Sequence, residues 1–310
     1  MDFALDADQS AVLDAVDVII ERYGGAARAR ELGGDEPSYD HELHGRLRDA
    51  GFLDVSVDTP CRTDAALVVE RVARGLGVVA AGYAALVAPS LGLRVDGPIA
   101  VAVDGAVGPV RFAAEAEAVV LVGERQVRLL RPSPASVRTS SSRLGWPIGE
   151  IVTDVNVAGD AVVLDGVSPD EVRAWWRVAV AAEAVGSMRS ALDMAVAHVS
   201  GREQFGQRIG SFQAVQHGLA KCAVAVDGAR WLAYEAAWSG DPVNAATAVS
   251  AALRAARAVR RDTHQYCGAI GFTTEYDLHL ATMRLLALAV EAESIGCPEI
   301  AAATGRWSLC

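Results

Sequence analysis

The sequence predicts a mainly α-helical protein with a small β domain in the middle of the chain. Apolar residues recur at helical spacing in the first 95 residues and again from residue 169 onwards, whereas residues 96–168 hold short valine-rich runs separated by Gly, Pro and Asp. Short loops join the long helical patterns of the last part, which is typical of an antiparallel bundle. We therefore expect an N-terminal helical domain at 1–95, a small middle β domain at 96–168 and a C-terminal four-helix bundle at 169–310.

The N-terminal part holds four expected helices. They are about Asp6–Tyr23, Tyr39–Ala50, Asp64–Leu76 and Val78–Val87. The first has the apolar face of an amphipathic helix and stops at Gly24 and Gly25. The second stops at Gly51, because glycine often ends a helix, and the fourth stops before Pro89.

The middle part is expected to form about five strands, because each run is four to seven residues long, rich in β-branched residues and bounded by turn formers. These runs are Ile99–Val103, Ala118–Val122, Gln126–Leu130, Ile151–Val157 and Ala161–Leu164. The bundle that follows is expected to contain four long helices. These are Glu171–Ser200, Phe212–Ser239, Ala245–Cys267 and Leu278–Ile295.

Composition excludes several classes of protein. The chain has 310 residues, 52% of them hydrophobic, which is enough to bury a sizeable core. Its 28 basic and 39 acidic residues give a net charge of −11, which argues against binding to a nucleic-acid backbone. The acidic N-terminus is unlike a secretory signal, and no apolar run is long enough to span a bilayer, so we expect no membrane partner.

The cysteines indicate a reducing compartment. There are five, scattered along the chain: Cys61, Cys222, Cys267, Cys297 and Cys310. Their number is odd and no C-x-x-C spacing occurs, so they fit neither a disulfide framework nor a metal site. We expect a cytoplasmic protein without a metal.

The loop between the first two bundle helices carries a candidate binding motif, SGREQFGQRIGSFQAVQHGLA from Ser200 to Ala220. Arg202 offers a fixed charge and a planar fork of donors suited to phosphate or carboxylate. Gly206 allows a ligand or a neighbouring chain to approach the backbone. The alternative is an ordinary surface loop, in which Arg202 is a solvated charge and Phe205 and Phe212 anchor the loop.

A second candidate motif closes the third bundle helix, QYCGAIGFTTE from Gln265 to Glu275. Gly268 and Gly271 supply backbone freedom for a turn, and exposed amides there can accept an anion. The alternative is that the two glycines only end the helix.

Together, the two motifs resemble those of the acyl-CoA dehydrogenase family. The resemblance rests on R-x-x-F-G followed by F-Q, and on a Q-x-x-G motif in which Ala269 replaces the family's second glycine. The opening M-D-F-x-L and the later L-R-D-A-G-F-L are also similar. In the family the first loop reaches into a neighbouring subunit and holds the pyrophosphate end of its FAD. The resemblance implies an FAD-binding groove formed by Arg202, Phe205, Gly206, Phe212, Gln213, Gln265, Gly268 and Ala269.

Other family features are missing from the sequence. The T-E-P-x-x-G-S-D signature that contacts the flavin ring does not occur between Ala88 and Val110. The family also needs a carboxylate base for α-proton abstraction while hydride leaves to the flavin. Its two usual positions correspond to Ala292 and Trp176 here, neither of which is acidic.

Three carboxylates are weak substitutes for the missing base. Glu183 lies in an apolar run, where burial can tune an acid, although a structural acid satisfied by neighbouring groups is the simpler interpretation. Glu291 and Glu293 are expected to face solvent. His217 and His264 have no paired acid at useful spacing, and Trp175 with Trp176 suits a core or an interface.

The resemblance therefore points to the smaller, degenerate subunit of the heteromeric α2β2 acyl-CoA dehydrogenases that actinobacteria use on steroid side chains. It implies that a larger partner supplies the base and the ring contacts, that an acyl-CoA is the substrate and that an electron-transfer flavoprotein or a similar acceptor takes the electrons. Two alternatives stay open. One is a self-sufficient homo-oligomeric dehydrogenase that uses Glu183 or Glu291, and the other is a scaffold or binding protein that has lost flavin.

Overall fold

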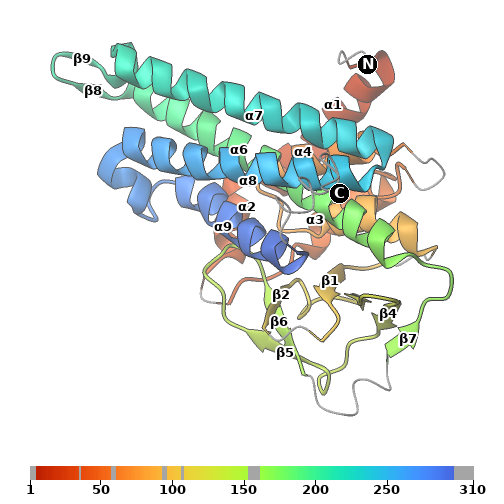
Figure 1. Ribbon diagram of the computed structural model, residues 1–310. Helices are drawn as coiled ribbons and strands as arrows, with labels where there is room; N and C mark the ends of the chain where they lie inside the picture. The colour runs from red at the N-terminus through yellow and green to blue at the C-terminus, as the bar shows by residue number, and fades with distance from the viewer. Residues whose placement is uncertain are drawn as a thin grey trace.

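The computed structural model describes residues 5–34, 36–56, 61–92, 96–105, 108–152 and 161–296. Helices come from both ends of the chain and strands from its middle, as the sequence predicts. Figure 1 shows the long helices α6 to α9 side by side, with the strands of the middle part gathered below them. The division into three domains at the expected boundaries stays a prediction.

Three of the four expected N-terminal helices are present to within two residues at each end, whereas the expected helix Val78–Val87 is replaced by a shorter π-helix. The N-terminal helices are α1 (Ala7–Tyr23), α2 (Gly25–Leu32), α3 (His41–Asp49) and α4 (Thr63–Arg74), followed by the short π-helix η1 (Tyr83–Val87) and the 3-10 helix η2 (Ala88–Leu91). Helix α1 begins at a capping box between Asp6 and Gln9 and ends at Gly24, whose N–H bonds the Ile20 carbonyl. Helix α2 was not expected, because Gly24 and Gly25 end one helix and begin the next instead of opening a loop.

Seven described strands form the β part. They are β1 (Ile99–Val103), β2 (Pro109–Arg111), β3 (Ala118–Val122), β4 (Val127–Leu130), β5 (Val137–Ser140), β6 (Ile148–Ile151) and β7 (Ala161–Val163). One sheet has the order β1-β3-β4-β7, with β1 and β3 parallel, and a second has the order β2-β6-β5. The expected strand Ile151–Val157 is wrong at its start, since Ile151 ends β6, and its residues from 153 lie outside the described ranges. Strands β2 and β5 were missed, and so was β6 apart from its last residue.

The four long C-terminal helices confirm the predicted ones to within three residues. They are α6 (Pro169–Gly201), α7 (Gln213–Ser239), α8 (Pro242–Cys267) and α9 (Leu278–Ser294). Ser168 and Asp241 cap α6 and α8 by accepting backbone N–H bonds, with proline at the first helical position of each. Helix α6 packs against α4, α7, α8 and α9, which explains why its apolar residues surround the whole helix.

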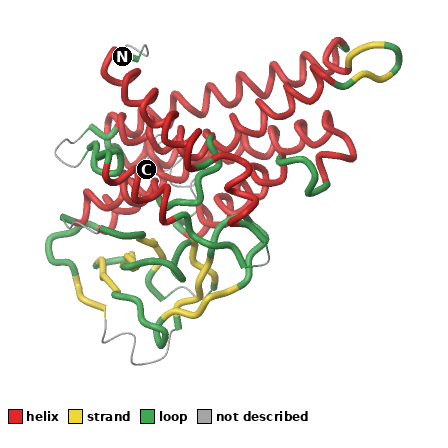
Figure 2. Tube along the Cα trace, turned by 180° about the vertical axis from the view of Figure 1, so that it is seen from behind, coloured by secondary structure: helices red, strands yellow, loops and turns green. Residues whose placement is uncertain are grey.

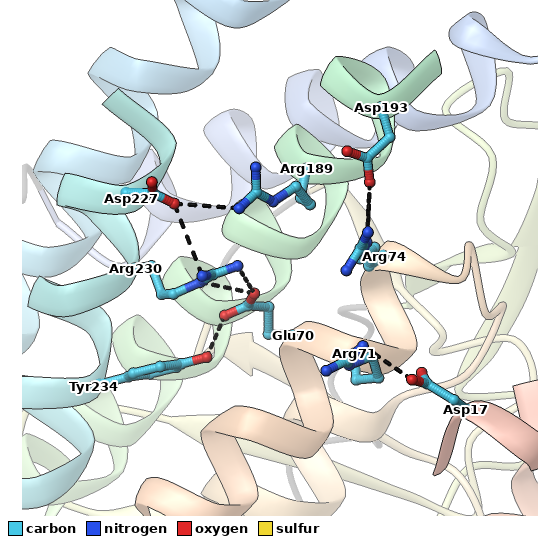
Figure 3. A network of polar contacts seen from close by, with 9 residues as sticks. All are labelled: Asp17, Glu70, Arg71, Arg74, Arg189, Asp193, Asp227, Arg230 and Tyr234. Carbon is cyan, nitrogen blue, oxygen red and sulfur yellow. Dashed lines mark hydrogen bonds and ion pairs between the residues drawn. The ribbon is translucent and has the colours of Figure 1, made fainter. Parts of the chain in front are cut away.

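A polar network fastens α4 to the bundle (Figure 3). Glu70 of α4 accepts bonds from Arg230 Nε at 3.0 Å and from the Tyr234 hydroxyl at 2.6 Å, both on α7. At Gly186 of α6 a Cβ would lie 2.2 Å from the Glu70 carbonyl oxygen, so only glycine permits this close approach of the two helices. None of the described helices combines the length and apolar character needed to cross a membrane.

Candidate functional site

The Ser200–Ala220 motif folds into a hairpin that projects from one end of the bundle (Figures 1 and 2). Its strands are β8 (Glu203–Gln204) and β9 (Gln207–Arg208), and the 3-10 helix η3 (Ile209–Ser211) leads into α7. The two turn residues, Phe205 and Gly206, both have positive φ, 55° and 78°. This is the backbone of the two-residue turn that suits a hairpin, but a phenylalanine adopts it only at a cost.

The hairpin holds its chemical groups out into solvent. Phe205 is 92% exposed, and its described ring contact is an edge-on one with Phe212, 6.3 Å between centroids. Arg202 follows the last turn of α6, where its N–H bonds the His198 carbonyl. Its guanidinium is exposed and forms no hydrogen bond or ion pair with the described residues. Gln213, the first residue of α7, is also exposed.

The second motif lies at the same end of the bundle (Figures 1 and 2). Gln265 is exposed on the last turn of α8, and Ala269 is exposed in the 3-10 helix η4 (Gly268–Phe272). Gly268 has φ 65°, and nothing lies within 4 Å of the place that a Cβ would take, so a ligand can reach this backbone. The nearby ends of α7 and α8 are in contact, since a Cβ on Gly218 would meet the Tyr266 hydroxyl.

The weak catalytic candidates lie elsewhere, in a buried cluster below the bundle. Arg111 of β2 donates from Nη1 to Glu183 of α6 at 2.5 Å and from Nε to Glu291 of α9 at 2.8 Å. Glu291 also accepts the Tyr83 hydroxyl at 2.6 Å and the Trp176 indole N–H at 2.5 Å. We call these five residues the Arg111 cluster. It joins β2 to α6, α9 and η1.

The position of Glu291 corrects the expectation that it faces solvent. Its side chain is 10% exposed, because this face of α9 packs against β2 and α6 and meets Arg111 there. Glu293, on the other face, is exposed as predicted. Arg111 itself was not singled out in the sequence. Its signal was an arginine between Val110 and Phe112, a charge set in an apolar run.

Burial and pairing act against each other in the Arg111 cluster. Burial raises the pKa of Glu183, and the neighbouring Arg111 opposes that rise. Burial lowers the pKa of Arg111, but Glu183 and Glu291 outweigh it and hold that pKa well above the ordinary value. Burial lowers the pKa of Arg284, which bonds the Leu76 and Gly77 carbonyls, to about 9. At neutral pH both arginines are therefore charged.

The histidines and tryptophans singled out in the sequence lie outside both regions or belong to the core. His264 bonds the Thr282 hydroxyl at 2.9 Å, whereas His217 is exposed on α7. Trp175 and Trp176 are 4% and 1% exposed, so both belong to the core as expected. Trp176 in addition positions Glu291 through its indole N–H.

Comparison with known proteins supports the resemblance seen in the two motifs. The family model "Acyl-CoA dehydrogenase, C-terminal domain" matches residues 173–300. The acyl-CoA dehydrogenase IpdE2 of Mycobacterium tuberculosis is 38% identical over 103 residues, which are 33% of this chain and 32% of that protein. The fold of the chain matches the crystal structure of the ChsE4-ChsE5 complex from Mycobacterium tuberculosis with a TM-score of 0.80 and 22% identity, covering 99% of each chain.

Residues 173–300 match the C-terminal domain of the acyl-CoA dehydrogenase family, and the chain as a whole has the fold of these enzymes. A second structural match is the Tcur3481-Tcur3483 steroid ACAD, with a TM-score of 0.80 and 20% identity over 96% of this chain and 98% of that one. At these identities the structural matches establish the fold. The sequence match to IpdE2 covers about a third of that relative and about a third of this chain.

Within this acyl-CoA dehydrogenase fold, the two described regions offer different chemistry. The hairpin end presents an arginine, exposed aromatic and amide side chains, and an open glycine backbone, which are groups suited to a diphosphate and a ring. The Arg111 cluster presents two carboxylates that both pair with Arg111, while Oε1 of Glu183 is buried and accepts no hydrogen bond from the described residues. Both oxygens of Glu291 accept hydrogen bonds, Oε1 from Tyr83 and Trp176 and Oε2 from Arg111.

Proposed function

We propose that this chain is the smaller subunit of a heteromeric, flavin-dependent acyl-CoA dehydrogenase. In an α2β2 assembly it contributes the ADP-binding half of the FAD site, while a larger partner contributes the base and the contacts to the flavin ring. The complex carries out α,β-dehydrogenation of an acyl-CoA thioester in the cytoplasm and passes its electrons to an electron-transfer flavoprotein or a similar acceptor. Steroid side-chain thioesters are the proposed substrates, because one structural match is a steroid ACAD.

One observation carries this proposal: the side chains proposed to bind FAD are exposed, apart from half-buried Phe212, whereas the candidate bases are buried and paired. Arg202 makes no described ion pair, but Glu183 and Glu291 both bind Arg111. A subunit that used its own base would need a carboxylate that is free to take a proton. This chain instead has exposed side chains at the hairpin end that are available to bind a ligand.

The residues at the hairpin end fit the ADP portion of FAD. Arg202 would bind the diphosphate through two parallel N–H bonds, and the Phe205 ring would cover the ligand. Gln213 and Gln265 would supply side-chain hydrogen bonds. Supporting positions come from Gly206 and Phe212 in the hairpin segment and from Gly268 and Ala269 after α8. When bound, the flavin supplies the hydride acceptor.

The test is co-expression of the chain with each neighbouring dehydrogenase gene, followed by an absorbance spectrum in the flavin band. We expect a colourless or weakly yellow chain alone and a yellow, active complex. Arg202→Ala should remove most of the FAD from the complex. Arg208→Ala is the matched control, since Arg208 lies on the same hairpin and its side chain is 69% exposed. Equal FAD content in wild type and Arg202→Ala would overturn the proposed half-site.

A second arm of this test separates the proposal from the self-sufficient alternative. Glu291→Gln and Glu183→Gln keep the shape of the side chain and remove the capacity to act as a base. We expect the turnover of the complex to stay within about twofold of wild type for both, after matching for folded protein. If the chain alone is yellow and either variant abolishes its turnover, the chain is a complete dehydrogenase. A complex that stays colourless with every partner would mean a scaffold without flavin.

A further inference from the structure

Tyr266 of α8 fits into a notch on α7 that exists because residue 218 is a glycine. A Cβ on Gly218 would overlap the Tyr266 hydroxyl oxygen and lie 2.5 Å from the ring carbon Cζ, closer than non-bonded atoms approach. Gly218 is buried although His217 before it is exposed, which agrees with the tyrosine ring covering the glycine. A larger residue at position 218 would therefore displace the ring or push the two helices apart.

A second contact, one turn further along, fixes the register of the two helices. Cys222 of α7 is buried, and its thiol donates to the carboxylate of Asp262 on α8 at 3.7 Å. Each residue of this pair lies four positions from its counterpart in the first pair, which is one helical turn. The two contacts therefore follow each other along one antiparallel seam, and a slide of either helix would break both.

This seam ends at the surface to which we assign FAD binding. Gln213 begins α7, five residues before Gly218, and Gln265 directly precedes Tyr266 near the end of α8. At a rise of about 1.5 Å per residue, the notch lies about 8 Å along the helix axis from Gln213. The contact between Gly218 and Tyr266 therefore joins the two segments close to the place where both leave the bundle.

We propose that Tyr266, seated on Gly218, is a positioning residue for the ADP half of the FAD site. It sets the distance between the hairpin segment, which carries Arg202, and the segment after α8, which carries Gly268. A ligand that bridges two segments binds more tightly when their separation is fixed before it arrives. Tyr266 acts through these segments, not by contact with the ligand. This inference rests on the proposed function and adds how two motifs far apart in the sequence are held at one ligand.

The experiment measures FAD binding by the co-expressed complex after its flavin has been removed, with flavin fluorescence as the signal. Gly218→Ala should weaken FAD about tenfold, because displacement of the Tyr266 ring moves the two segments apart. Tyr266→Leu leaves the notch unfilled and should weaken FAD to a similar extent. Leucine lacks the hydroxyl, Cζ and Cε2 atoms that a Cβ at position 218 would meet. The double variant Gly218→Ala, Tyr266→Leu should therefore bind FAD within about threefold of wild type.

Two control variants separate positioning from ordinary stability. Gly228 lies on the exposed face of α7, with nothing within 4 Å of the place that a Cβ would take, so Gly228→Ala should leave FAD binding unchanged. Cys222→Ala weakens the same seam further from the site, where the notch still fixes the register. It should lower the melting temperature and change FAD affinity less than about twofold.

Hydrogen exchange of the chain alone tests the packing without flavin. Gly218→Ala should speed exchange of the backbone amides of residues 268–273, and Cys222→Ala should not. Melting curves establish that each variant is folded. If Gly218→Ala does not fold, Tyr266→Leu carries the same test, because it introduces no overlap.

The positioning role is overturned if Gly218→Ala and Tyr266→Leu bind FAD like wild type, if Cys222→Ala weakens FAD as much as they do, or if the double variant shows no recovery. These outcomes differ from failure of the proposed function. When Arg202→Ala keeps its FAD, the half-site itself is wrong. When Arg202→Ala loses FAD and the two notch variants keep it, the half-site stands and Tyr266 does not position it.

Discussion

The hairpin end of the bundle and the Arg111 cluster each contain an arginine, but the two arginines differ in burial and in pairing. Arg202 is exposed and has no described ion pair, whereas the Arg111 side chain is 6% exposed and binds two carboxylates. A solvated charge needs no partner, but a buried one is tolerated only when paired and hydrogen-bonded. The difference separates residues available to a partner or ligand from residues committed to holding the β part against the helices.

This comparison predicts that Arg111→Ala is the most damaging of the substitutions considered. It would leave Glu183 and Glu291 buried without their cation, and removal of one partner from a buried ion pair costs about 3–5 kcal/mol. We expect a loss of that size in the free energy of unfolding, measured by guanidinium chloride denaturation.

Arg138→Ala is the matched control for this change. Arg138 of β5 pairs with Glu150, but its side chain is 73% exposed, so its loss should cost less than about 1 kcal/mol. The triple variant Arg111→Met, Glu183→Leu, Glu291→Leu should recover much of the lost stability, because no buried charge is then left unpaired. If Arg111→Ala and Arg138→Ala cost the same, the Arg111 cluster does not hold the two parts together.

The network around Glu70 gives the next largest expected effect. Glu70→Ala removes a buried acceptor from Arg230 and the Tyr234 hydroxyl and should lower the free energy of unfolding by about 2 kcal/mol. Asp193→Ala, in the same region of Figure 3, is the control. Asp193 pairs with Arg74 at side-chain exposures of 47% and 41%, so this change should cost less than about 0.5 kcal/mol. Thermal melts of the two variants at one protein concentration compare their stabilities. An equal loss of stability in Glu70→Ala and Asp193→Ala would show that burial does not decide the cost.

The sequence predicted the long helices well because each carries its own signals. The pattern of α8 is helical over its length, although the expected start at Ala245 is three residues late because the capping Asp241 and the following proline were not used. The short strands were harder. Strand β2 spans three residues, Pro109–Arg111, and is defined by pairing with β6 almost forty residues later, which no local pattern records.

The candidate sites divide in the same way. The hairpin motif is a contiguous stretch, so its residues could be named from sequence. The partners of Arg111, by contrast, are Glu183 and Glu291, which are 72 and 180 residues away in the sequence. An arginine set in a strand and a glutamate near the end of a helix both resemble surface residues. Only the packing of α9 against β2 and α6 buries them together, and that contact is not encoded locally.

A pH dependence is expected from the buried His44 of α3, whose Nδ1 lies 2.7 Å from the Tyr39 hydroxyl. Burial lowers the pKa of His44 from its ordinary value of 6.5. Between the two pKa values the unfolded chain binds more protons than the folded one, so stability falls as the pH drops below about 6.5. We expect the melting temperature at pH 5.5 to be below that at pH 7.5.

His44→Gln should reduce this loss on acidification, because the glutamine can still bond Tyr39 but does not titrate. His41→Gln is the control, since His41 has a 63% exposed side chain beside Glu115. His198 and His264, whose pKa values burial also lowers, will retain part of the effect in both variants. If the loss of stability on acidification is the same in His44→Gln as in the wild type, protonation of His44 does not cause it.

The smallest expected effect, and the one of opposite sign, comes from the turn of the hairpin. Phe205 has φ 55° and is 92% exposed, so its conformation costs free energy that no described core contact returns. Asn-Gly is the favoured pair for such a turn, and Phe205→Asn should raise the free energy of unfolding by up to about 1 kcal/mol. The same change should lower the FAD content of the co-expressed complex, because the ring is lost. Phe205→Tyr keeps the ring and the strain, and should leave both quantities unchanged. If Phe205→Asn stabilises the chain and the complex still holds its FAD, the strained phenylalanine has a role other than flavin binding.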